Sequence, residues 1–175
     1  MSNAMNDAIS EPDTTKAVVA YIGIGANLGD ARASVLQALA NLAQLPATKM
    51  LRQSSLYRSA PFEADGDDYI NAVAAISTAL PAHQLLAALQ TIEQAFDRKR
   101  PYFHAPRTLD LDLLLYDDQC IATPTLTVPH PGITLRTFVL LPLLEIAPSL
   151  VIPAAGPAQQ FAAVLSGQRI ERLNN

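Results

Sequence analysis

Apolar residues follow two different periods along the chain, and these periods predict four strands and two main helices. The run at 17–25 is β-rich and nearly continuous in apolar character, as expected of a central strand. Strands are also predicted at 48–59 and 69–80, because the segment between them, 60–68, has the proline, glycine and acidic residues of a loop. The fourth strand is predicted at 104–116.

Helical spacing follows the first and the third of these strands. Asp30 is a good N-cap for the first helix, and Pro81 is favoured in the first turn of the second. The predicted core positions are Val35, Leu39, Leu42 and Leu45 in the first helix and Leu85, Leu86, Leu89, Ile92 and Phe96 in the second.

The order strand, helix, strand, strand, helix, strand is typical of the ferredoxin-like fold (βαββαβ). In this α+β architecture two helices cover one face of a four-stranded antiparallel sheet. We therefore expect the other face of the sheet to be open. Short helices are predicted at 137–148 and 158–167, after a proline-interrupted stretch, and are interpreted as C-terminal additions to the core.

Composition and charge exclude several classes of protein. The 175 residues suit one domain, assigned to 17–175, and residues 1–16 include "SNA" before Met5, which indicates a tag-derived, disordered N-terminus. The net charge of −4 argues against a nucleic-acid partner. No apolar run reaches the roughly 20 residues of a membrane span. With a single cysteine, Cys120, and no signal-peptide pattern, we expect a cytoplasmic protein. We also expect it to act as a monomer on small molecules.

Two carboxylates interrupt the fourth predicted strand, in the stretch "HAPRTLDLDLLLY". Residues two apart on a strand share a face, so Asp110 and Asp112 point one way and Leu109, Leu111 and Leu113 the other. Carboxylates at this spacing could hold hard divalent cations such as Mg²⁺. The alternatives are that the pair simply faces solvent or forms salt bridges with Arg107.

Basic residues gather just before this strand, at Arg98, Lys99, Arg100 and Arg107. Arginine presents a planar fork of donors that suits phosphate oxygens. Basic residues also favour the C-terminal end of a helix, and this alternative explains Arg98 and Lys99 better than Arg107. His130 could donate to a phosphate or be structural.

Asn71 is unusual in an apolar strand, because a buried amide must find hydrogen-bonding partners. Those partners could be backbone groups or a flat heterocycle. The chain has no phosphate-loop or protein-kinase signature. If ATP binds, it binds in some other way.

Several motifs, in this order, resemble the 6-hydroxymethyl-7,8-dihydropterin pyrophosphokinase family of folate biosynthesis. They are "YIGIGANLGD", "SSLYRSAP", "DYINAV", "APRTLDLDLLLYDD" and "TVPHPGITLRTFVLLPLLEIAP", and the resemblance runs from about 18 to 153. It implies a ferredoxin-like fold and the transfer of pyrophosphate from ATP to the pterin hydroxymethyl group, giving AMP. It also implies that Asp110 and Asp112 hold two Mg²⁺ ions, one bridging the α- and β-phosphates and the other the β- and γ-phosphates.

The resemblance also implies roles for other residues of this chain. Catalytic roles fall to Asp110, Asp112, Arg98 and Arg107. The implied ATP contacts are Gln90, Glu93, Arg98, Arg100, Arg107, His130 and Arg136. The implied pterin contacts are Ser59, Ala60, Phe62, Tyr69, Asn71, Asp110 and Phe138.

The chain departs from the family pattern in three places. The common loop Arg-Trp-Gly-Pro-Arg is replaced by "FHAPR" at 103–107, so the loop arginine and tryptophan that help to seal the site are missing. Ala26 stands where serine is frequent, and the Thr-Pro-Pro of some members becomes "SAP" at 59–61. None of these changes affects the two aspartates, so we expect retained chemistry with altered loop kinetics.

Two other functions remain possible from the sequence. The first is another metal-dependent enzyme acting on phosphate esters, a nucleotidyltransferase or hydrolase. It would give Asn71 and Phe138 no reason to face the aspartates. The second is a binding module that senses a nucleotide or a pterin without turnover, and the altered loop is its one source of support.

Overall fold

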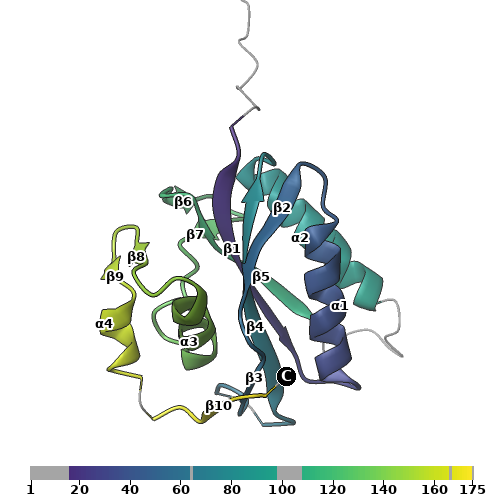
Figure 1. The fold of residues 1–175 in the computed structure, drawn as a ribbon, viewed down its shortest axis with the longest axis vertical. Coiled ribbons are helices and arrows are strands. Elements are labelled where there is room, and N and C mark those ends of the chain that lie inside the picture. Colours follow the sequence, from purple (N-terminus) through teal and green to yellow (C-terminus); the bar gives the residue numbers. More distant parts are fainter. Residues whose placement is uncertain (1–15, 64, 98–107, 166, 175) are drawn as a thin grey trace, which may run out of the picture.

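The fold is a mixed α+β structure built on an antiparallel sheet (Figure 1). It is seen in a computed structural model, which describes residues 16–63, 65–97, 108–165 and 167–174. The strands run in the order β10-β3-β4-β1-β5, and β2 also pairs with β4. The strands of this sheet are β1 (Val18–Ala26), β2 (Thr48–Gln53), β3 (Tyr57–Ser59), β4 (Tyr69–Thr78), β5 (Asp110–Tyr116) and β10 (Ile170–Arg172).

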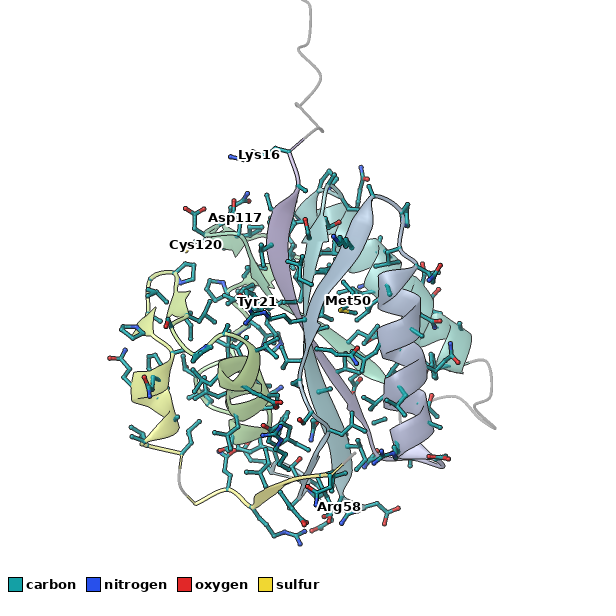
Figure 2. All side chains as sticks on the ribbon, viewed as in Figure 1. Lys16, Tyr21, Met50, Arg58, Asp117 and Cys120 are labelled. Atoms are coloured by element: carbon teal, nitrogen blue, oxygen red, sulfur yellow. The ribbon has the colours of Figure 1, made fainter. Side chains whose placement is uncertain are left out.

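Helices lie on both faces of this sheet. Helices α1 (Ala31–Ala43) and α2 (Ala82–Asp97) cover one face, and α3 (Thr137–Ile146) packs on β4 and β3 from the other (Figure 1). In Figure 2, Met50 lies on the side of α1 and Tyr21 on the side of α3. The expectation of helices on one face therefore holds for α1 and α2, but the opposite face is partly covered and not fully open.

Local sequence explains where the first two helices begin. The Asp30 side chain accepts a hydrogen bond from the amide of Ala33 at 2.9 Å, as expected of an N-cap. α2 begins at Ala82, directly after Pro81. The predicted core positions Val35, Leu39, Leu42, Leu85, Leu89 and Ile92 are buried, and Leu45, Leu86 and Phe96 pack against the same core.

The strand predicted at 48–59 is divided in the structure. β2 ends at Gln53 and β3 begins at Tyr57. Between them, the Ser54 amide donates to the Val73 carbonyl, and the Val73 amide donates back to Ser54 Oγ, both at 2.9 Å. The prediction of one continuous strand was wrong because this side-chain bond takes the place of a ladder bond and changes the course of the chain.

The C-terminal part contains more elements than the sequence predicted. α3 is confirmed, but the helix expected at 158–167 is reduced to the single turn α4 (Gln159–Ala162). Two small hairpins were missed, β6 (Ile121–Ala122) with β7 (Thr127–Val128) and β8 (Val151–Ile152) with β9 (Gly156–Pro157). β10 was also missed, and it extends the main sheet beside β3.

Two sequence predictions fall partly outside the described residues. The prediction of a tag-derived, disordered N-terminus concerns 1–16, of which 1–15 lie outside the described residues. The fourth strand was predicted from 104, and its residues up to 107 also lie outside them. Among the described residues it begins at Asp110. No helix in the described part of the chain is both long and apolar enough to cross a membrane.

Candidate active site

The two aspartates lie on β5, on the sheet face that carries α3, and β5 is next to the inner strand β1. Asp110 pairs with Gly25, and Asp112 pairs with Gly23. On the other side of β1, Gly25 pairs with Asn71. Asp110 and Asp112 are half-buried, whereas Leu111 is buried in the core beneath α1 and α2. The predicted alternation is confirmed, and it brings Asp110 and Asn71 to opposite sides of one glycine.

Two glycines in β1, Gly23 and Gly25, shape the site in a way that was not predicted from the sequence. A Cβ atom at Gly25 would lie 3.2 Å from Asn71 Oδ1, and one at Gly23 would lie 3.3 Å from a methyl carbon of Leu114. Because neither residue has a side chain, the space above the sheet between the aspartates and Asn71 stays unfilled. The spacing Gly-Ile-Gly within a predicted strand was the available signal, since glycine in a strand interior often marks a close approach of another group.

A cavity of about 410 Å³ opens above this face. A volume of this size suits a small-molecule ligand. The predicted site residues that line it are Ser59, Ala60, Phe62, Tyr69, Asn71, Asp110, Asp112, His130, Arg136 and Phe138. Residues that line it without having been predicted are Gly23, Ile24, Gly25, Pro61, Ala72, Val73 and Val139.

One end of the cavity combines a buried amide with aromatic rings. Asn71 is 3% exposed, and its Nδ2 donates to Ser59 Oγ at 2.8 Å. This bond leaves Oδ1 as the polar atom of Asn71 above Gly25. Phe62 and Phe138 meet edge to face, with ring centroids 6.4 Å apart. Together these groups can bind a flat heterocycle with polar edges.

The other side of the cavity carries positive and ionisable groups. His130 Nδ1 accepts from the Gly132 amide at 3.0 Å, so the proton of the neutral ring belongs on Nε2. His130 Nε2 lies 3.8 Å from Asp112 Oδ1. Burial, more than the nearby charge of Arg136, lowers the pKa of His130, although Asp112 opposes the shift. A neutral imidazole can donate through Nε2 to an anionic group.

The Arg136 guanidinium reaches the aromatic end of the cavity. It lies 5.9 Å from the Phe62 ring centroid and 5.8 Å from that of Phe138, within the range of cation–π attraction. A Cβ at Gly132 would come within 2.8 Å of the Arg136 side chain, so glycine leaves the space that this side chain occupies. Arg136 thus links the aromatic rings to the polar side of the cavity.

Tyr69 stands close to the first aspartate. Burial, followed by the negative charge of Asp110, raises the pKa of the Tyr69 phenol. The phenol is therefore neutral near pH 7 and remains a hydrogen-bond donor next to the carboxylate. This arrangement agrees with the position of Tyr69 in the cavity lining.

The two predicted nucleotide contacts on α2, Gln90 and Glu93, differ in their surroundings. Glu93 Oε1 accepts from the Leu111 amide at 2.7 Å. Leu111 stands between Asp110 and Asp112 in the sequence, so Glu93 contacts the β5 backbone between the two aspartates. Gln90 is exposed, and neither residue lines the cavity. Arg98, Arg100 and Arg107 lie outside the described residues, as does the altered loop at 103–105.

Asp110 and Asp112 are the residues that could hold a metal ion. Among the described residues, no group of three or more His, Cys, Asp or Glu side chains could do so. Mg²⁺ commonly takes only one or two protein carboxylates and completes its shell with water and substrate phosphates. A carboxylate pair at the mouth of a cavity fits that donor set, because the remaining ligand positions would face the space for substrate.

Fold and site together define an α+β protein with a cavity for a small, flat and polar ligand beside a pair of carboxylates. The model of the family described as 7,8-dihydro-6-hydroxymethylpterin-pyrophosphokinase (HPPK) matches residues 21–148. The chain belongs to this family.

Two curated relatives illustrate the similarity. Both are named 2-amino-4-hydroxy-6-hydroxymethyldihydropteridine pyrophosphokinase. The protein from Pseudomonas aeruginosa is 40% identical over 154 residues, covering 87% of this chain and 95% of its own. The protein from Haemophilus influenzae is 39% identical over 158 residues, covering 90% of this chain and 99% of its own.

Solved structures agree with the fold. A structure titled as HPPK-DHPS in complex with substrates matches 86% of this chain with a TM-score of 0.70 and 12% identity. Wild-type HPPK-DHPS from Plasmodium falciparum matches 85% with a TM-score of 0.69 and 12% identity. This chain spans 43% and 44% of the length of those two chains.

Proposed function

We propose that this protein transfers the β,γ-pyrophosphoryl unit of ATP to the hydroxymethyl oxygen of 6-hydroxymethyl-7,8-dihydropterin. The products are AMP and the pterin diphosphate, and the reaction is a step of folate biosynthesis. The observation that carries the proposal is that Asn71 and Phe138 line the same cavity as Asp110 and Asp112. Another phosphate-handling enzyme would need the carboxylates but would have no use for the amide and the aromatic rings beside them.

The aromatic end of the cavity is the proposed pterin site. Phe62 and Phe138 offer apolar surface for a flat ring, and Tyr69 lies beside the carboxylate of Asp110. Asn71 Oδ1 lies close to Gly25 at the base of the cavity and would accept a hydrogen bond from an N–H group on the edge of the pterin ring. Ser59 and Ala60 complete the wall next to Asn71.

Asp110 and Asp112 are the proposed ligands of two Mg²⁺ ions. When bound, the ions would neutralise charge on the triphosphate and favour loss of the proton from the attacking hydroxyl. The half-buried position of both carboxylates at the cavity mouth supports this assignment. Tyr69 and His130 stand next to them and would restrain the directions in which the two carboxylates point.

The triphosphate is proposed to extend from the two aspartates on β5 towards Glu93 of α2. His130 would donate through Nε2, and Arg136 would pair with phosphate oxygens by its planar fork. Glu93, held by the Leu111 amide, is proposed to face the nucleotide together with Gln90. Arg98, Arg100 and Arg107, outside the described residues, are proposed to supply the remaining positive charge.

The proposed reaction needs no covalent protein intermediate. The bond from the β-phosphorus to the oxygen of AMP breaks, and a bond from the pterin oxygen to the β-phosphorus forms as the hydroxyl proton is lost. Enzymes catalyse phosphoryl transfer chiefly by alignment and charge stabilisation. In this chain, alignment would come from Asn71 and the Phe62–Phe138 pair at one end, from His130 at the other, and from Arg136 beside the two rings.

The finer description of the fold and setting is also a proposal. The core is proposed to be ferredoxin-like, supported by the strand order β5-β1-β4 followed by β2 and β3 with α1 and α2 on one face. The protein, one domain over 17–175, is proposed to act as a cytoplasmic monomer on small molecules, without a nucleic-acid or membrane partner. Its net charge of −4 agrees with the absence of a nucleic-acid partner.

The proposal is tested by measuring AMP formed from ATP and Mg²⁺, with and without 6-hydroxymethyl-7,8-dihydropterin. The wild type is compared with Asp112→Ala and with Asp118→Ala, a control in the exposed turn after β5. We expect pterin-dependent AMP from the wild type and the control and none from Asp112→Ala.

Four other results would contradict the proposal, wholly or in part. ADP as product, or turnover that does not depend on pterin, would favour a different phosphate enzyme. Pterin binding without AMP formation would favour the sensor. Full activity in Asp112→Ala would remove the proposed metal role.

A further inference from the structure

Helix α3 starts at the cavity with an unusual N-cap residue. The N-cap is Arg136, in an extended conformation with φ −123° and ψ 114°, and its side chain makes no capping hydrogen bond. The first amides of a helix lack partners within the helix, and Ser, Thr, Asp or Asn usually supplies one. Arginine has no acceptor and cannot do so. The first amides of α3 therefore need an acceptor other than the Arg136 side chain.

The missing cap comes from the C-terminal tail, through Gln168. Its Oε1 accepts from the Thr137 amide at 2.8 Å, and its Nε2 donates to the Leu135 carbonyl at 3.0 Å. These two backbone groups flank Arg136, so one side-chain amide pairs with both sides of that residue. Thr137 Oγ1 also donates to the Leu165 carbonyl at 3.2 Å, which adds a third bond between the tail and the helix start.

The backbone held in this way carries two side chains of the cavity. Arg136 lies between the flanking hydrogen bonds, and its guanidinium contacts both Phe62 and Phe138. Phe138 is in the first turn of α3. A rotation of the Arg136 backbone would move its guanidinium by several ångströms at the end of a long side chain. The two bonds from Gln168 oppose that rotation directly.

We propose that Gln168 is a positioning residue, which caps α3 from the C-terminal tail and so holds Arg136 towards the reacting phosphates. The inference rests on the proposed function, because it takes Arg136 as a phosphate contact. It extends the functional part of the chain beyond residues 21–148, which the family model matches. Arg136 serves the cavity at a position that ordinarily provides the cap, and Gln168 provides the cap in its place.

Another tail contact near the cavity is an exposed ion pair. Arg169 pairs with Asp68 at 2.7 Å, next to Tyr69, but the Arg169 side chain is 72% exposed. Exposed ion pairs contribute little because water and salt screen them. The neutral amide of Gln168 bonds to two backbone groups and is not screened in this way. The loss of Gln168 should therefore matter more than the loss of Arg169.

The test compares the wild type with Gln168→Ala, Gln168→Glu and Gln160→Ala. Gln160 is a matched control, because its Nε2 also donates to a backbone carbonyl, that of Ala155, but away from the cavity. The assay measures kcat and the KM for ATP and for the pterin. Hydrogen exchange of the Thr137 amide and the melting temperature are measured on the same samples.

We expect Gln168→Ala to lower kcat by about tenfold and to change the KM for ATP by less than about threefold, since a misplaced Arg136 stabilises the transition state less. Exchange of the Thr137 amide should become faster in the same variant. Gln168→Glu keeps the acceptor beside the helix N-terminus and should retain a higher kcat than Gln168→Ala. Gln160→Ala should match the wild type.

Several results would overturn the inference. An unchanged kcat in Gln168→Ala would do so, even with a lower melting temperature, because the residue would then be structural only. An unchanged Thr137 exchange rate would rule out the cap, as would Gln168→Glu no more active than Gln168→Ala. A wild type without pterin-dependent AMP would overturn the proposed function itself, and the inference with it.

Discussion

The two faces of the sheet come from the same strands, but they differ in how completely they are covered. On the face beneath α1 and α2, the inward residues are apolar along the whole strand, as with Ile22 and Ile24 in β1 and Leu111 and Leu113 in β5. All four are at most 5% exposed. This face is a closed core.

The opposite face changes character along its length. Val73 and Leu114 pack against α3 in a second apolar cluster. Past the start of α3, the same face carries Gly25, Asn71 and Asp110 around the cavity. Covering this end with apolar side chains would remove the space for a ligand.

The closed face contributes mainly to stability, and the open end contributes mainly to ligand binding. The closed face buries apolar surface, which is the main favourable contribution to folding. The open end holds partly exposed charges and glycines, which contribute little to folding but give a ligand access to polar groups. Changes on the closed face should therefore lower stability, and changes at the open end should lower activity.

The largest effect is expected at the open end, from Asp110→Asn. Removing one charge from the proposed metal pair should lower kcat/KM for AMP formation by about 1,000-fold, with little loss of stability. Asp117→Asn is the control, because Asp117 is exposed in the turn after β5 and has a φ of 52°, which asparagine tolerates. An Asp110→Asn variant that kept a tenth of the activity would contradict the division between the faces.

On the closed face, Leu113→Ala should lower the free energy of unfolding by about 3 kcal/mol, because it leaves a cavity in a packed core. The activity per folded molecule should stay near that of the wild type. Urea unfolding measures the loss, with Leu51→Ala as control at a residue that is 45% exposed. Equal losses in the two variants would contradict the prediction.

A third effect is expected at Glu145, through which α3 is bonded to residues near β3 and to β10. The Glu145 carboxylate accepts from Ser55 Oγ at 2.8 Å and Tyr57 Oη at 2.7 Å, and it lies 3.3 Å from Arg172. Glu145→Gln should cost about 2 kcal/mol at pH 7. The control is Glu171→Gln, since Glu171 makes one exposed ion pair at 3.9 Å and should cost far less.

The ionisation of Glu145 predicts how the stability of the fold depends on pH at the acidic end. Burial alone would raise the pKa of Glu145, but hydrogen bonds from Tyr57 and Ser55 and the charge of Arg172 lower it below its usual value. The stabilisation is therefore present above the unfolded-state pKa and is lost as pH falls through the lower folded-state pKa. Chemical unfolding at a series of acidic pH values should show this loss in the wild type and a smaller one in Glu145→Gln.

For Tyr57 the pKa is raised and not lowered, so its contribution to stability is lost at alkaline pH. Burial and the hydrogen bond to Glu145 raise the pKa of Tyr57 to about 12. Because the folded state holds the proton more tightly, this stabilisation is present below the ordinary pKa of tyrosine and is lost as pH rises towards 12. Tyr57→Phe should abolish this part of the alkaline loss, and an unchanged alkaline profile would argue against the Glu145 contact.

The smallest effect is expected from Ser59→Ala at the open end. It removes the acceptor of Asn71 Nδ2, so the amide loses a bond that fixes its orientation. We expect a KM for the pterin raised by about fivefold and a stability loss of about 1 kcal/mol. Ser77→Ala is the control, because Ser77 lies on β4 like Asn71 but does not line the cavity. A larger change in kcat than in the pterin KM would show that Asn71 acts in some other way.

The sequence by itself determined the main elements and much of the site. Apolar periodicity predicted β1, β4, α1 and α2, because local spacing decides which side of an element is apolar. The alternation of Asp110 and Asp112 with leucines predicted that both carboxylates leave the core. The motifs of the resemblance selected ten of the residues that line the cavity, but not Gly23 and Gly25.

Only the tertiary structure decided the remaining features, because each depends on residues far apart in the chain. The strand at 48–59 is divided where Ser54 bonds to Val73 and Ser55 to Glu145. A register shift between β1 and β5 brings Leu115 as well as Leu114 to the α3 side, against simple alternation. The cap on α3 comes from Gln168, which lies 31 residues from Thr137 in sequence. A local pattern gives the period of an element but not the partner that a polar group finds across the fold.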